Sequence, residues 1–131
     1  VDTDRCGAMG YCFGGLCALD IARSGADVRG VVSFHGLLNG ITGLDANAVR
    51  AKVLVQHGND DPFVSQEQFT DFVSEMNIAG ADWQIHQYGG VKHAFTNPAA
   101  DDHELGTVFN ASADRRSWQT MSNFFAEVFA R

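Results

Sequence analysis

Short apolar runs alternate with longer amphipathic stretches along this chain, and most runs end at glycine or at a cluster of turn residues. Four runs are typical of β-strands, because they are short and either rich in small and β-branched residues or alternate between apolar and polar positions. They cover approximately residues 5–10, 28–34, 52–57 and 82–88. The remaining long stretches carry apolar residues at helical spacing, which predicts alternating strands and helices.

Three helices are predicted from this spacing and from their end signals. The first spans residues 14–24, is followed by Gly25 as its C-terminal cap, and should pack Cys17 into the core. The second follows a capping box formed by Ser65 and Gln68 and ends at Gly80, and the third begins near Ser112. Their predicted buried sides contain Leu16, Leu19 and Ala22 in the first helix, Phe69, Phe72, Val73 and Met76 in the second, and Trp118, Met121, Phe125 and Val128 in the third.

The order of these elements predicts an α/β fold with a parallel sheet of about four strands and helices on both faces. The small residues of the first strand suit a strand that helices cover on both sides. A connector over residues 37–49 contains apolar positions that could line a pocket or cover the core. These positions are Leu37, Leu38, Ile41 and Leu44.

Composition narrows the possible partners and compartments. The 131 residues form one domain, 1–131, and the 45% hydrophobic share is sufficient for a packed core. A net charge of −7 argues against nucleic acid and anionic membrane as partners. We expect neither a membrane span nor a signal peptide, because the sequence has no long apolar run and no basic leader. Three cysteines without disulfide-scaffold spacing favour a reduced, cytoplasmic setting.

The segment Gly10-Tyr11-Cys12-Phe13-Gly14-Gly15 connects the first strand to the first helix. Glycines two residues before and after Cys12 match the nucleophile elbow, a strained strand-to-helix turn that exposes its central side chain. The helix N-terminus should favour a thiolate at Cys12 and an oxyanion beside it. A glycine-rich turn around a small buried cysteine is the alternative interpretation, and the strand-to-helix context favours the functional one.

Cys12, Asp61 and His93 each follow the end of a predicted strand, where parallel sheets place their chemistry. Their order is that of a nucleophile, an acid and a base in α/β-hydrolases, in which a carboxylate orients the imidazole that takes the nucleophile's proton. We therefore predict an Asp61–His93 hydrogen bond with the imidazole facing the Cys12 sulfur. The alternatives are Asp60 as the acid and His35 or His57 as the base, with His86 and His103 less favoured.

A metal site is a further interpretation of four of these side chains, namely Cys12, His35, His57 and His93. Their spacing matches no zinc pattern, so we expect neither a metal nor a cofactor. We also predict that Cys12 is the most reactive of the three thiols, because Cys6 and Cys17 should face packed surroundings.

Three motifs in this order resemble the dienelactone hydrolase family, and the likeness covers the whole chain. They are the segment around Cys12, then Gly58-Asn59-Asp60-Asp61-Pro62, then Lys92-His93-Ala94-Phe95-Thr96-Asn97-Pro98. The resemblance implies an α/β-hydrolase fold with Cys12 as nucleophile, Asp61 as acid and His93 as base. It implies an oxyanion donor at the Phe13 N–H and substrate contacts from Tyr11, His35, Phe95 and Asn97.

Two departures from the family pattern change the expected function. Family members that act on dienelactone carry an arginine where this chain has Asn97, so a broader ester or lactone substrate is expected. The family also has about four strands before the elbow, so the chain resembles the C-terminal half of the fold and lacks the part that gives the second oxyanion donor.

These features lead to two main hypotheses. The first is a cysteine-dependent hydrolase of small carboxylic esters or lactones that works through an acyl-enzyme. The second is a truncated, catalytically weak domain that acts as a self-associating or binding module. Thiol redox chemistry lacks a resolving partner, because Cys17 is inside a helix. An unpaired first strand also predicts a homodimer that buries this side.

Overall fold

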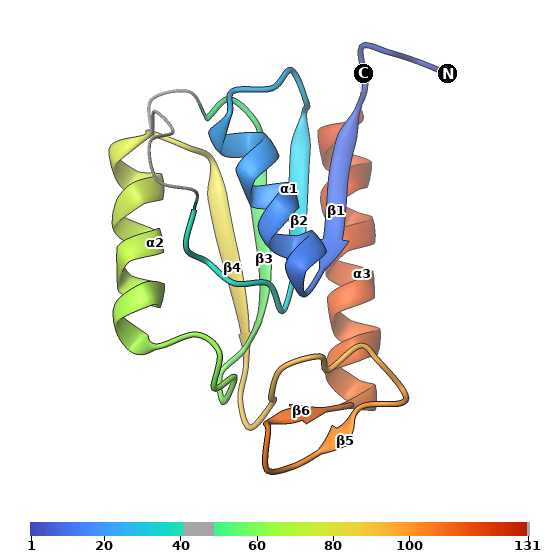
Figure 1. Cartoon of the computed structure of the whole chain (residues 1–131). Helices are drawn as coiled ribbons and strands as arrows, with labels where there is room; N and C mark the ends of the chain where they lie inside the picture. The colour runs from blue at the N-terminus through green and yellow to red at the C-terminus, as the bar shows by residue number, and fades with distance from the viewer. Residues whose placement is uncertain (41–48, 131) are drawn as a thin grey trace.

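A computed structural model describes residues 1–40 and 49–130 of the protein. Four parallel strands form one sheet in the order β1-β2-β3-β4, which confirms the predicted α/β architecture (Figure 1). The strands are β1 (Gly7–Tyr11), β2 (Gly30–Phe34), β3 (Lys52–Gly58) and β4 (Trp83–Tyr88). The helices are α1 (Phe13–Arg23), α2 (Gln66–Ile78) and α3 (Ala111–Val128). A two-stranded antiparallel unit, β5 (Asp101–Asp102) and β6 (Thr107–Val108), was not predicted and lies between β4 and α3.

Alternation along the central strands gives the sheet two apolar faces, each covered by helix. Val31 and Val53 face one side, where they pack with Leu19 of α1 and Phe72 of α2. On the other side, α3 covers a separate cluster formed by Val32, Phe34, Leu54, Met121, Phe124 and Val128. The predicted coverage of both faces is therefore confirmed, with α1 and α2 on one face and α3 on the other (Figure 1).

Strand β1 forms one edge of the sheet and pairs only with β2 among the described residues. The edge position was predicted, but full coverage by helices was not correct. Met9 and Tyr11 are each 40% exposed, because their side of β1 extends past the area that α3 covers. The apolar residues of this strand therefore remain partly accessible to solvent.

Two predicted core side chains are exposed instead. Cys17 lies on the outer side of α1, and Trp118 of α3 is 55% exposed. The helix is rotated relative to the prediction, because its buried side is formed by Ala113, Ser117, Met121, Phe124 and Val128. In the connector, Leu38 is buried and belongs to the core, whereas Leu37 is partly exposed; Ile41 and Leu44 fall outside the described residues.

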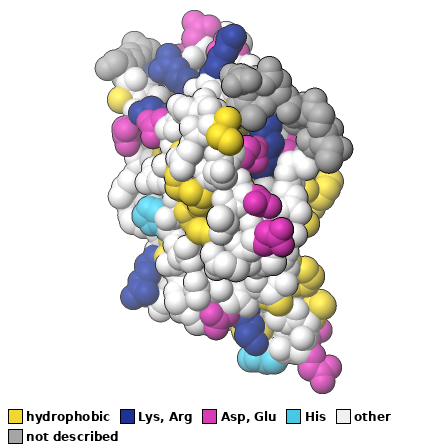
Figure 2. All heavy atoms as spheres, turned by 90° about the vertical axis from the view of Figure 1, so that its left-hand side faces the viewer, with side chains coloured by type: hydrophobic (Ala, Val, Ile, Leu, Met, Phe, Trp, Pro, Cys, Tyr) yellow, Lys and Arg dark blue, Asp and Glu magenta, His cyan; other side chains and the backbone are white. Residues whose placement is uncertain are grey.

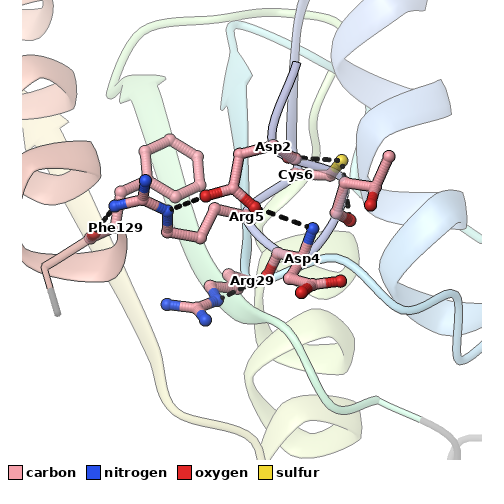
Figure 3. Close-up of polar contacts among 7 residues, drawn as sticks. Asp2, Asp4, Arg5, Cys6, Arg29 and Phe129 are labelled. Atoms are coloured by element: carbon pink, nitrogen blue, oxygen red, sulfur yellow. Dashed lines mark hydrogen bonds and ion pairs between the residues drawn. The ribbon is translucent and has the colours of Figure 1, made fainter.

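Polar contacts join the segment before β1 to the end of α3 and to the start of β2 (Figure 3). Arg5 donates to Asp2 Oδ2 at 2.6 Å and to the carbonyl oxygen of Phe129 at 3.4 Å. Arg29, just before β2, donates to the carbonyl oxygen of Asp4 at 2.9 Å. These contacts hold the beginning of β1 against the end of α3, so the edge strand enters the sheet at a fixed position.

The outer surface of the helical layer is mixed in charge. Acidic and basic side chains are interspersed with hydrophobic ones on the side that α2 covers (Figure 2). Within residues 1–40 and 49–130, no helix combines the length and apolar character needed to cross a bilayer.

Arg23, at the end of α1, is the most buried cation of the described chain and links three elements. Its guanidinium donates to Glu75 of α2 at 2.6 Å, to Asp20 at 2.9 Å and to the carbonyl oxygen of Leu38 at 2.6 Å. The Arg23 side chain is only 3% exposed, whereas Glu75 is 27% exposed. This network holds the connector that follows β2 between α1 and α2.

We predict that Arg23→Met lowers the free energy of unfolding by about 2–4 kcal/mol, because it leaves a partly buried carboxylate and carbonyl without their donor. Urea unfolding followed by circular dichroism measures the change. The exposed Arg115 provides the control, since Arg115→Met should change stability by less than about 0.5 kcal/mol. Equal stability of Arg23→Met and Arg115→Met would contradict the prediction.

Candidate active site

Cys12 occupies the turn between β1 and α1 with a left-handed backbone, φ 52° and ψ −120°. This region is costly for a residue with a side chain, so the surroundings must hold it. A Cβ atom at Gly10 would lie 2.0 Å from the carbonyl oxygen of Gly14, and one at Gly15 would lie 2.5 Å from Ser33 Oγ. The missing side chains thus let β1, α1 and β2 approach closely enough to form the predicted elbow.

The predicted acid and base are joined by a hydrogen bond of 2.8 Å between His93 Nδ1 and Asp61 Oδ2. The other oxygen of Asp61 accepts from the Phe63 backbone N–H at 2.8 Å, and the carboxylate is fully buried. Asp60, the alternative acid, is exposed and accepts from Asn59 instead. The predicted Asp61–His93 pair is therefore present.

Backbone contacts from β5 and β6 position His93. Its N–H donates to the Gly106 carbonyl oxygen, and its own carbonyl accepts from the Val108 N–H, both at 3.0 Å. The loop after β3 is joined to the same region, because the Asp60 N–H donates to the Val91 carbonyl oxygen at 2.9 Å. Acid and base thus lie on two loops that share backbone hydrogen bonds.

His35, at the end of β2, is the imidazole that contacts the Cys12 thiol. Its Nδ1 lies 3.3 Å from Cys12 Sγ, and its Nε2 lies 2.8 Å from Thr96 Oγ1. His35 has a left-handed backbone, φ 39°, and is 2% exposed. Donor atoms of Cys12, His35 and His93 all lie within 4.8 Å of one another, so the thiol lies near both histidines but contacts His35.

Burial sets the protonation of this group. It lowers the pKa of His35 to about 4, with a further contribution from the nearby His93, so His35 is neutral at pH 7. Burial, assisted by the Asp61 carboxylate, raises the pKa of the Cys12 thiol above its ordinary value. The resting state is therefore a thiol next to a neutral imidazole, which differs from the thiolate expected from the helix N-terminus alone.

A pocket of about 540 Å³ opens beside Cys12. It is lined by Tyr11, Cys12, His35, Ala94, Thr96, Asn97, Pro98, Asp114 and Trp118. Of the predicted substrate contacts, Tyr11, His35 and Asn97 therefore face this pocket. Phe95 does not, because it is fully buried and packs edge-on against His35, with ring centroids 4.9 Å apart.

Five pocket residues were not among the predicted site residues, namely Ala94, Thr96, Pro98, Asp114 and Trp118. Thr96 belongs to the quoted histidine motif and could have been found there, whereas Asp114 and Trp118 lie one turn apart on α3. Trp118 had been assigned to the helix face that packs on the sheet, so its exposure beside the pocket could not be read from helical spacing. Burial raises the pKa of Tyr11, and the negative charge of Asp114 raises it further.

The other strand-end histidine is separate from this group. His57 is 4% exposed, packs against Phe69, and its Nδ1 has no hydrogen-bond partner among the described residues.

Cys6 and Cys17 are both exposed, so their expected packing was wrong. The prediction that Cys12 is the most reactive thiol remains, but it can no longer rest on burial of the other two.

One protein family matches almost the whole chain. Its sequence profile, described as the dienelactone hydrolase family, matches residues 1–129. An uncharacterised protein of Caenorhabditis elegans is 39% identical over 99% of this chain and 84% of its own length. A protein of Aquifex aeolicus provisionally named carboxymethylenebutenolidase is 26% identical over 92% of this chain and 50% of its own length.

A solved structure extends this likeness to three dimensions. A dienelactone hydrolase-like promiscuous phosphotriesterase from metagenomic libraries is 40% identical and superposes with a TM-score of 0.92. It aligns with 99% of this chain, which spans 55% of that protein. This chain thus covers about half the length of several relatives. The chain belongs to the dienelactone hydrolase family.

Proposed function

We propose that this chain carries the active site of a cysteine-dependent hydrolase that cleaves carboxylic esters or lactones through an acyl-enzyme. The supporting observation is that Cys12, on its strained turn beside a pocket, lies within 4.8 Å of a His93 that is hydrogen-bonded to Asp61. Family membership supports hydrolysis in general. The thiol mechanism and the substrate class are the further steps argued here.

Proton transfer begins with the Asp61–His93 pair. Because His93 Nδ1–H donates to Asp61, its Nε2 is left with a lone pair that can accept the Cys12 proton. His35 is a poor base, since a pKa of about 4 leaves it little affinity for a proton at pH 7. In this mechanism the thiol turns from His35 to His93 when substrate enters.

Hydrolysis then follows from the thiolate. Cys12 Sγ attacks the ester carbonyl carbon, and the carbonyl electron pair moves to oxygen. When the intermediate collapses, the C–O bond to the alcohol breaks and the imidazolium of His93 gives its proton to the leaving oxygen. Water then loses a proton to His93, attacks the thioester and releases the acid, which restores the thiol.

The oxyanion of the intermediate needs donors at the start of α1. The Phe13 N–H belongs to the first turn of this helix and lies at the positive end of its dipole, whereas the Gly15 and Leu16 N–H groups donate to the Cys12 carbonyl oxygen. The side chain of Phe13 is 75% exposed, so its proposed contribution comes from the backbone alone. Loss of one such donor typically costs about a hundred- to a thousandfold in rate.

Charge in the pocket favours neutral or cationic substrates over carboxylates. Asn97 occupies the position where dienelactone-hydrolysing members carry arginine, and Asp114 supplies a negative charge in the same pocket. Asp114 makes no ion pair within residues 1–40 and 49–130. A neutral ester or lactone with an apolar group against Trp118 therefore suits this pocket. Neutral phosphotriesters deserve inclusion in assays, given the description of the solved relative.

We predict that Cys12→Ser lowers kcat/KM for p-nitrophenyl acetate by at least about a thousandfold, because the hydroxyl is a far weaker nucleophile in this thiol site. Intact-mass measurement after rapid quenching should show one acetyl group on the parent chain and none on the variant. Cys17→Ser, which removes an exposed thiol of the same helix, should leave both readouts unchanged. Equal loss of activity in the two variants would refute the assignment of the nucleophile.

Asp114→Asn should change substrate preference rather than overall activity. We expect kcat/KM to rise about three- to tenfold for the anionic p-nitrophenyl hemisuccinate and to fall for the cationic butyrylthiocholine. For the neutral p-nitrophenyl butyrate it should stay within about twofold. These changes correspond to roughly 1 kcal/mol for a partly exposed charge. Glu67→Gln removes an exposed charge on α2 and should change none of the three. Uniform effects on all three esters would contradict the role in charge selection.

A homodimer is also proposed, with a second copy of the chain covering β1. The outer edge of β1 makes no pairing with a described strand, and the neighbouring Met9, Tyr11 and Phe13 are exposed. Two such edges related by a two-fold axis would satisfy both rows of backbone groups and bury apolar side chains. Such an interface should exceed the roughly 800 Å² that is typical of crystal contacts.

Sedimentation velocity tests this second proposal. The parent chain should sediment as a dimer at tens of micromolar, and Met9→Lys should shift it toward monomer because a lysine blunts an edge strand. Leu105→Lys changes a more exposed apolar residue, between β5 and β6, and should leave the dimer intact. A monomeric parent chain would exclude the dimer.

A further inference from the structure

Cys12, His35 and His93 place one sulfur and two imidazole rings around a common space. One donor atom from each lies within 4.8 Å of the others, and Cys12 Sγ lies 3.3 Å from His35 Nδ1. The hydrolytic mechanism uses His93 as base but gives His35 no proton to carry. The second imidazole therefore needs a separate explanation.

In each imidazole ring, the nitrogen that points away from Cys12 donates a hydrogen bond, so the other nitrogen keeps its lone pair. His93 Nδ1–H donates to Asp61, so its Nε2 keeps a lone pair. For the Cys12 thiol to donate to His35 Nδ1, the ring must carry its proton on Nε2, which then donates to Thr96 Oγ1 at 2.8 Å. Both imidazoles thus hold the tautomer that a metal ligand requires, with an oxygen partner behind each ring.

We propose that Cys12, His35 and His93 form a binding site for a thiophilic divalent cation of the Zn²⁺ type, which reversibly blocks the nucleophile. Zn–S and Zn–N bonds of about 2.3 and 2.0–2.1 Å at tetrahedral angles put ligand atoms roughly 3.3–3.6 Å apart. The Cys12–His35 separation of 3.3 Å is slightly below the S···N value of about 3.5 Å, and the other separations lie within 4.8 Å, so small side-chain rotations would bring the three ligand atoms to this geometry. The fourth position would take water from the pocket beside Cys12.

Charge and proton balance fit such a cation. On binding, Cys12 loses its proton to solvent, one metal–sulfur and two metal–nitrogen bonds form, and water leaves the aqueous ion. The thiolate and the buried Asp61 carboxylate together offset the two positive charges. The spacing of these residues in the sequence matched no zinc pattern because the three ligands come from the ends of β1 and β2 and the loop after β4, which only the fold brings together.

Cobalt titration tests the site without any substrate. We would use the Cys6→Ser/Cys17→Ser background, which removes the two exposed thiols, and follow thiolate-to-Co²⁺ charge-transfer and four-coordinate visible bands. One equivalent of Co²⁺ should develop both bands, and Zn²⁺ should remove them. Asp61→Asn should weaken binding about 10- to 100-fold, since it removes the partner behind His93.

Ligand variants separate this site from adventitious binding. In the same background, His35→Asn should weaken Zn²⁺ binding by on the order of a hundredfold or more, and asparagine suits the left-handed backbone of that position. Cys12→Ser should abolish the charge-transfer band. His57→Asn changes a buried strand-end histidine outside the group and should leave the titration unchanged.

The outcomes also separate this proposal from the proposed function. Parent protein without the bands, or bands that persist in both His35→Asn and Cys12→Ser, would overturn the metal site. Ester turnover that Zn²⁺ does not inhibit would also contradict it. Metal binding by a chain that turns over no ester would instead count against the hydrolase assignment and leave the metal site standing.

Discussion

The left-handed backbone at Cys12 is the constraint on which the site depends. A side chain at Gly10 or Gly15 would collide with α1 or with Ser33, so the glycines permit a packing that in turn holds the strained turn. Backbone strain of this kind persists only where the surroundings over-determine it. The close approach of β1, α1 and β2 therefore fixes both the direction of the thiol and the position of His35, which follows β2 directly.

The two imidazoles near Cys12 differ because their environments differ. His93 is partly exposed and hydrogen-bonded to the Asp61 carboxylate, whereas His35 is buried and hydrogen-bonded to the Thr96 hydroxyl. A carboxylate stabilises an imidazolium, while burial without one keeps the ring neutral. In the proposed mechanism the first histidine accepts the proton, and the second holds the uncharged thiol before substrate enters.

The sequence was sufficient to predict the order of strands and helices, the elbow and the Asp61–His93 bond, because each has a local signature in glycines, turn residues or strand ends. It was not sufficient for features that depend on how elements meet. Trp118 and Cys17 satisfy helical spacing, yet the helices are rotated so that neither packs on the sheet. The contact between Cys12 and His35 joins the ends of two neighbouring strands, and the number of residues between them in the sequence does not reveal how close these ends lie in space. The short strands β5 and β6 carry too few residues for a periodic signal.

The backbone hydrogen bonds around His93 have a mechanical consequence. The loop with Asp61 is joined to the segment before His93, and His93 is itself joined on both sides to the β5–β6 unit. Asp61 and His93 are consequently held on loops that share backbone hydrogen bonds, whereas Cys12 lies at the end of the edge strand β1. A small displacement of the edge strand β1 would alter the distance from the Cys12 sulfur to the His93 imidazole without breaking the Asp61–His93 hydrogen bond. Thermal loosening of this sheet edge should therefore separate the Cys12 sulfur from His93 before the Asp61–His93 pair itself separates.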